Sequence, residues 1–326
     1  MNSIEGTRKK IYSRGMRRLT LKQLQTVRAV AQSGTIATAA DQLKVTPAAL
    51  TARIKLLESD VGLSFFDRAG GRLRLTDAGR EVVATTVRME MLLVELGNTL
   101  AAIKGKHAGH ISVGIVSTAK YFAPRIVAAF SKENPKIDLS LSIGNRQATI
   151  TLLRDYEIDI ALMGQPPTDF PVISQVIGQH PQVMIAPLDH PLAGRRDIDK
   201  SELTQESFIV REDGSGTRTI FDFFFGDVVV RQPHIKFEIG SNETIKQAVM
   251  AGLGLSLISG HTIEAEVAAG RLAVLDVKGL PIVRQWFLVR RANWSPTPVG
   301  EAMWDFACKH AADFMPGAMV HEPEPV

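Results

Sequence analysis

The spacing of the apolar residues changes near residue 107, and this change constrains the fold more than any other feature of the chain. Before it, apolar residues recur at the spacing of amphipathic helices. After it, short apolar runs alternate with helical segments, which predicts strands connected by crossover helices. The 326 residues correspond to about two domains. We therefore expect an all-helical N-terminal region followed by a larger α/β region.

The N-terminal region predicts a helix-turn-helix over about residues 36–55. Thr35 is placed to cap one short helix, and after a tight turn Thr46 caps a longer one whose first residue is Pro47. Two short helices followed by a longer, capped helix are typical of this motif, and its last helix enters the major groove of DNA. A small helical bundle is the alternative.

A basic hairpin is predicted directly after these helices. Gly70 and Gly71 can form its turn, and arginines on both sides suit phosphate or minor-groove contact. Residues 19–76 are therefore expected to form a winged helix-turn-helix. The expected DNA-binding residues are Thr35, Thr46, Pro47, Ala48, Thr51, Arg53, Lys55, Arg68, Arg72 and Arg74.

The charge distribution agrees with a polyanionic partner for the N-terminal region alone. Residues 1–106 contain 18 Lys and Arg against 9 Asp and Glu, whereas the remainder contains 20 against 25. A basic region on an acidic body indicates nucleic-acid binding. Residues 1–18 read as a basic tail, and Met16 is a second candidate start.

Residues 77–106 predict one long amphipathic helix with Thr76 and Asp77 as its cap. Its apolar stripe must be buried, and pairing with the same helix of a second copy is the economical solution. Packing onto the body of its own chain is the alternative. The stripe comprises Val83, Val87, Met91 and Val94.

Residues 107–326 predict two α/β lobes, because a strand–helix–strand–helix–strand pattern occurs in the first half and recurs in the second. Lobe I is expected to comprise about residues 107–181 and 285–326, and lobe II about residues 182–284. Two such lobes leave a cleft in which small ligands bind.

Several predicted strand-to-helix loops carry donors that suit an anion. Glycine, serine and asparagine also occur in such loops simply as caps, which is the plainer interpretation. Because the loops come from both lobes, we expect them to converge on a ligand cleft. The expected effector-binding residues are Ser117, Thr118, Asn145, Arg146, Gln165, Arg211, Ser215, Thr217, Arg218, Asn242 and Glu243.

Other classes of protein lack support in the sequence. No nucleophile elbow, P-loop or dinucleotide fingerprint is present. With one cysteine, Cys308, and scattered histidines, we expect no metal site, no cofactor and no catalysis. His261, near the end of a predicted strand, can line the cleft, but a cap or a surface position is the favoured interpretation. No apolar run approaches the ~18 residues of a membrane span, and no signal peptide is evident, so we expect a cytoplasmic protein without membrane contact.

Residues 19–106 resemble the N-terminal region of LysR-type transcriptional regulators. The segments that carry this resemblance are LKQLQTVRAVAQSGTIATAADQLKVTPAALTARIKLLESDVGLSFFDR and RLRLTDAG. The body resembles the two-lobed effector domain of that family, which is built like type 2 periplasmic binding proteins. Pro47 departs from the family pattern, because many relatives carry a base-contacting glutamine there.

The chain also resembles the branch of the family that regulates Calvin-cycle operons, including those for RuBisCO. The matching segments are TPAALT, ISVGIVSTAKYFAPRIVAAF, IGNRQ, IDIALMGQPP and REDGSGTR. The resemblance implies a homodimer or homotetramer that binds promoter DNA with dyad symmetry and contacts RNA polymerase. It also implies activation of carbon-fixation genes and a small-molecule effector, either a phosphorylated metabolite or NADPH.

Three other functions remain open at this level. The first is a regulator of the same family that acts in sulfur, nitrogen or aromatic metabolism. The second is a cytoplasmic solute-binding protein with an unrelated basic head. The third is an enzyme, which lacks a catalytic constellation in this sequence.

Overall fold

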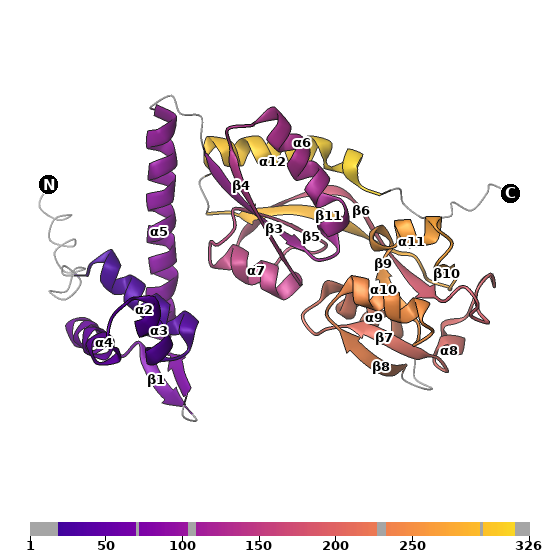
Figure 1. The fold of residues 1–326 in the computed structure, drawn as a ribbon, viewed down its shortest axis with the longest axis horizontal. Coiled ribbons are helices and arrows are strands. Elements are labelled where there is room, and N and C mark those ends of the chain that lie inside the picture. The colour runs from indigo at the N-terminus through magenta and orange to yellow at the C-terminus, as the bar shows by residue number, and fades with distance from the viewer. Residues whose placement is uncertain (1–18, 70–71, 104–108, 227–232, 294–295, 317–326) are drawn as a thin grey trace, which may run out of the picture. The chain divides into compact units, whose positions relative to one another are not determined.

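The computed structural model divides into two compact units, Met1–Gly97 and Asn98–Val326, which are described separately. The predicted tail over 1–18 lies outside the described residues. No helix among those that the structure describes combines the length and apolarity of a membrane span. The described residues are 19–69, 72–103, 109–226, 233–293 and 296–316 (Figure 1).

The N-terminal unit contains the three predicted helices, each with a threonine N-cap. The helices are α2 (Leu21–Ser33), α3 (Ile36–Gln42) and α4 (Pro47–Val61). The hydroxyl oxygens of Thr20, Thr35 and Thr46 accept hydrogen bonds from backbone N–H groups in the first turns. Pro47 is the first residue of α4, where its missing N–H costs nothing.

The predicted basic hairpin is present in this unit. Strands β1 (Phe66–Ala69) and β2 (Arg72–Leu75) pair antiparallel, with Phe66 opposite Leu75. The apolar faces of the three helices and this hairpin meet in two adjoining clusters. The buried residues of these clusters are Val27, Val30, Ala39, Ala40, Leu50, Ile54, Leu57 and Phe65. The winged helix-turn-helix fold is thereby confirmed.

The predicted long helix is α5 (Asp77–Ile103), and its first half packs on its own unit. Val83 contacts the cluster around Val27 and Leu57, and Val87 is buried. Half of the stripe expected to pair with a second copy is therefore covered within the chain. The side chains of Met91 and Val94 lie outside the described residues.

A different apolar face of α5 is exposed. Leu92, Leu93, Leu96 and Leu100 are 62%, 54%, 52% and 48% exposed, respectively. Such a run of leucines is unusual on a soluble surface.

Lobe I of the second unit is built on three parallel strands. They are β3 (His110–Val116), β4 (Asp138–Gly144) and β5 (Ile160–Met163), in the order β4–β3–β5. In Figure 1, α6 and α12 lie on one side of this sheet and α7 on the other. The helices are α6 (Ala123–Glu133), α7 (Arg146–Arg154) and α12 (Pro298–His310). The predicted strand–helix alternation of this lobe is confirmed.

Two long strands connect the lobes. They are β6 (Val172–Ala186) and β11 (Ile282–Arg291), which pair antiparallel along most of their length. The sequence predicts that a strand around Trp286 returns the chain to lobe I, but it does not predict β6. Its second half, from Pro181 to Ala186, is buried throughout, so the alternation that marks a half-exposed strand is absent.

Lobe II packs helices on both faces of its strands. Phe208 and Val210 of β7 point to the cluster with α9, while Ile209 points to the cluster with α10. The main elements are β7 (Ser207–Arg211), α9 (Gly216–Phe225), β8 (His234–Ile239), α10 (Asn242–Met250) and β9 (Ser256–Ser259). The shorter elements are α8 (Lys200–Leu203), α11 (Glu264–Ala268) and β10 (Ala273–Leu275).

Candidate DNA-binding surface and ligand cavity

The predicted base-reading residues lie at the exposed start of α4. Thr46, Pro47 and Ala48 are all exposed. Ala48, Thr51 and Lys55 share one face of the helix, because they are spaced by three and four residues. This face lies away from the buried stripe of Leu50, Ile54 and Leu57. The start of α4 therefore presents the small and basic side chains that a major groove admits.

The other predicted DNA contacts surround this helix within the N-terminal unit. Thr35 caps α3 and is exposed, as is Arg53 on α4. Arg74 on β2 is also exposed. Arg68 and Arg72 belong to the two hairpin strands, but their side chains lie outside the described residues.

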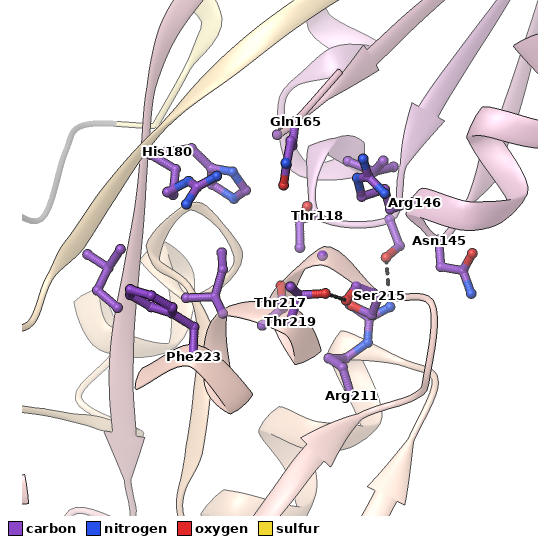
Figure 2. Close-up of a pocket in the computed structure, with 17 residues that line it drawn as sticks. Thr118, Asn145, Arg146, Gln165, His180, Arg211, Ser215, Thr217, Thr219 and Phe223 are labelled. Carbon is purple, nitrogen blue, oxygen red and sulfur yellow. Dashed lines mark hydrogen bonds between the residues drawn. The ribbon is translucent and has the colours of Figure 1, made fainter. Parts of the chain in front are cut away.

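A cavity of about 280 Å³ lies between the two lobes of the second unit. Figure 2 shows Thr118, Asn145 and Arg146 facing Ser215 and Thr217 across it. The predicted residues that line it are Ser117, Thr118, Asn145, Arg146, Gln165, Arg211, Ser215 and Thr217. The sequence analysis did not identify the other lining residues, which are Val116, Gly164, His180, Gly216, Thr219, Ile220, Phe223, Ile282 and Arg284.

The cavity suits an anion. Ser215, Gly216 and Thr217 place the N-terminus of α9 at its wall, where unpaired N–H groups and the helix dipole favour negative charge. None of the described lining residues is acidic, and three of them are arginines.

Arg211 is held by other groups of the protein. It is 2% exposed, and its guanidinium donates to Glu212, to Oδ1 of Asn242 at 2.6 Å and to Oγ of Ser117 at 3.1 Å. Burial disfavours the charged form of Glu212, but the hydrogen bond and charge of Arg211 outweigh it, so the pKa of that carboxyl lies below its ordinary value. Because Ser117 is in lobe I and Arg211 in lobe II, this arginine joins the two lobes.

Arg146 is the arginine left available at this end of the cavity. One hydrogen bond leads from its Nη2 to the carbonyl oxygen of Pro166 at 3.3 Å, and its buried Nε has no partner among the described residues. Burial lowers the pKa of Arg146, with Asp169 opposing this effect. A half-buried guanidinium whose buried Nε–H lacks a partner is suited to donate hydrogen bonds to an anionic ligand.

Three predicted effector-binding residues do not line the cavity. Arg218 forms ion pairs with Asp222 and Glu238. Asn242 is buried behind Arg211, as its hydrogen bond to that residue requires. Glu243 accepts a hydrogen bond from Tyr121 of lobe I at 2.5 Å. All three therefore bind other residues of the protein around the cavity and do not face its interior.

A buried aromatic cluster borders the far end of the cavity, where His180 lines the wall. His180 of β6 stacks on Trp286 of β11, with ring centroids 3.8 Å apart. Trp286 donates its indole N–H to Nδ1 of His261 at 3.0 Å. His261 is 3% exposed, so the expectation of a surface position for this residue is wrong. The sequence gives no local signal for this cluster, because its members come from distant segments.

Together, the fold and the sites define a class of protein in which a DNA-binding module is joined to a module that binds a small molecule. Two family models match the chain. The model for the bacterial regulatory helix-turn-helix protein of the lysR family matches residues 21–80, and the model for the LysR substrate binding domain matches residues 104–312. The chain belongs to the LysR family of DNA-binding transcription regulators.

Among curated relatives, the regulator CbbR of Xanthobacter flavus is 48% identical over 298 residues, which cover 91% of this chain and 90% of the relative. The RuBisCO operon transcriptional regulator of Allochromatium vinosum is 39% identical over 294 residues, covering 90% of this chain and 97% of the relative.

Solved structures share the fold. The CcmR regulatory domain of Synechocystis PCC6803, in complex with 2-PG, is 34% identical with a TM-score of 0.60, covering 62% of this chain and 97% of that chain. Full-length CbnR in complex with its target DNA is 20% identical with a TM-score of 0.61, covering 90% of this chain and 100% of that chain.

Proposed function

We infer that this protein regulates Calvin-cycle genes, including those for RuBisCO, as a cytoplasmic activator that responds to a phosphorylated metabolite or NADPH. The observation that carries the proposal is the 48% identity to a CbbR regulator over 91% of the chain. The cavity supports it, because Arg146, the start of α9 and a described lining without acidic residues favour a phosphate-bearing ligand.

The DNA-binding role is assigned to the start of α4 and to the hairpin. Thr46, Ala48, Thr51 and Arg53 read bases, while Lys55 and the arginines of the hairpin contact phosphates. A single module of this size binds weakly, so two half-sites with dyad symmetry and a dimer or tetramer are needed. The effector changes DNA binding, and through it the contact with RNA polymerase, by favouring one arrangement of the lobes.

DNA binding to the intergenic region upstream of the chain's own gene tests the proposal. We would measure footprints and affinity at several salt concentrations, with and without ribulose bisphosphate, 2-phosphoglycolate and NADPH. A sequence-specific, salt-sensitive complex that any of these ligands alters is expected. A specific complex indifferent to all three would reject the assigned pathway while keeping the regulator. Absence of any specific complex would reject the DNA-binding role.

A further inference from the structure

His180 has an unsatisfied hydrogen-bonding atom at the cavity. The residue is 5% exposed and lines the cavity from β6, and its Nδ1 has no partner among the described residues. A buried ring nitrogen without a partner is unfavourable, because it has lost its hydrogen bonds to water and gained none in return. An atom of this kind in a cavity wall calls for a ligand or a water molecule as its partner.

The orientation of the His180 ring is determined on its other sides. Its Nε2 shares a hydrogen bond of 3.0 Å with Oγ of Ser259, and one ring face stacks on Trp286 at an interplanar angle of 20°. Because both contacts constrain the ring, Nδ1 faces one direction.

Gly164, which also lines the cavity, lies directly beside that nitrogen. A Cβ atom at this position would lie 2.8 Å from Nδ1 of His180, closer than real Cβ contacts allow. Gly164 is not among the residues with a positive φ, so the backbone itself does not require glycine here. What requires glycine is the close approach of this backbone to Nδ1, with which any side chain here would collide.

Arg284 supplies a positive charge beside His180. The two residues are directly opposite on the antiparallel strands β6 and β11, and both line the cavity. Arg284 forms no ion pair with any residue that the structure describes, and the described lining contains no acidic group. Burial first, then His261 and Arg284, lower the pKa of His180 to about 3, so its ring is neutral and carries one proton.

We propose that His180 and Arg284 form a second anion subsite of the cavity, which binds a second anionic group of the effector. The Ser259 hydroxyl then donates to Nε2, and the Nδ1 proton is donated to an anionic oxygen. Figure 2 shows His180 at the opposite end of the cavity from Asn145 and Arg146. The ligand is therefore a compact molecule with two separate anionic groups, such as a phosphorylated carboxylic acid or a bisphosphate. This inference rests on the proposed function.

Calorimetry with the full-length protein tests this proposal, using 2-phosphoglycolate as the probe with two anionic groups and inorganic phosphate as the probe with one. His180→Gln keeps a polar atom near Ser259 but removes Nδ1. We expect it, like Arg284→Gln, to weaken binding of 2-phosphoglycolate about tenfold or more, with phosphate binding changed less than twofold. His180→Asn keeps a polar atom near the position of Nδ1, and we expect it to retain most of the affinity.

His234→Gln, an exposed histidine of β8 outside the cavity, is the matched control and is expected to bind as wild type. Gly164→Ala provides a second route, since its methyl group would collide with Nδ1 and displace the His180 ring from its position at the cavity; the same loss is expected. Equal binding of 2-phosphoglycolate by wild type, His180→Gln and Gly164→Ala would overturn the second subsite alone. A wild-type protein that binds neither probe would instead contradict the anionic effector of the proposed function, and this subsite with it.

Discussion

At the residue scale, two arginines of the cavity have different roles. The guanidinium of Arg211 donates to Glu212, Asn242 and Ser117, whereas the buried Nε–H of Arg146 has no partner in the described part of the chain. We therefore expect Arg146→Gln to weaken binding of 2-phosphoglycolate about tenfold or more, because a charge-assisted hydrogen bond is lost. DNA affinity without ligand should be unchanged. The exposed Arg125→Gln is the control, and a wild-type ligand affinity in Arg146→Gln would contradict the role.

The two buried histidines predict a pH dependence of stability. Burial is the main cause that lowers the pKa of His180 to about 3 and that of His261 to about 4. Because both values lie below the ordinary 6.5, the unfolded chain binds protons that the folded chain does not, and stability falls as pH drops below 6.5. Between pH 6.5 and 5, wild type should lose up to about 2 kcal/mol more than His180→Gln. Denaturant unfolding at both pH values measures this, and equal losses would contradict it.

At the element scale, the start of α4 has both a structural and a functional role. The Thr46 hydroxyl accepts from the N–H of Ala49, whereas the Thr51 hydroxyl donates to the carbonyl oxygen of Pro47 and caps nothing. Thr46→Ala should therefore destabilise the N-terminal unit by about 1 kcal/mol, and Thr51→Ala should not. Both should weaken specific DNA binding if both residues read bases. Thermal unfolding and footprinting separate the two effects, and a destabilised Thr51→Ala would contradict the distinction.

The two lobes are connected by a hydrogen bond outside the cavity. Tyr121 of the short helix η2 (Ala119–Tyr121) donates to Glu243, and burial followed by Glu243 raises the pKa of the phenol. Tyr121→Phe should weaken 2-phosphoglycolate binding roughly three- to tenfold, since one net hydrogen bond that favours this lobe arrangement is lost. Tyr156→Phe, whose hydroxyl accepts from Asn293 within lobe I, is the matched control. Identical affinities in the two variants would show that the Tyr121 bond does not stabilise the binding arrangement.

At the scale of the whole molecule, the sequence predicts what is locally encoded. The helices of the N-terminal unit follow from Thr35, Thr46 and Pro47, whose caps act within one turn. Strand β6 is missed because its second half is buried on both faces, which removes the alternation. His180 and Gly164 belong to the cavity only because distant segments pair. Arg218 of α9 reads as a ligand-binding residue because one of its acidic partners, Glu238 of β8, is distant in the sequence.

The exposed leucines of α5 make a prediction about assembly. Since Val83 packs on the N-terminal cluster and Val87 is buried, we expect a second copy to pair with the face that carries Leu92, Leu96 and Leu100. A charge buried in that interface would be strongly unfavourable, so Leu96→Glu should shift the protein toward monomer.

Sedimentation equilibrium measures the mass of the Leu96→Glu variant in solution. We expect the mass of a monomer, which is about half the mass of the wild-type protein if that is a dimer and less than half if it is a tetramer. Specific DNA affinity should fall at least tenfold, because a monomer contacts only one of the two half-sites. Leu63→Glu is the matched control, since Leu63 is 57% exposed on the N-terminal unit, close to the 52% of Leu96. A wild-type mass in Leu96→Glu, or an equal loss in Leu63→Glu, would place the interface elsewhere on the molecule.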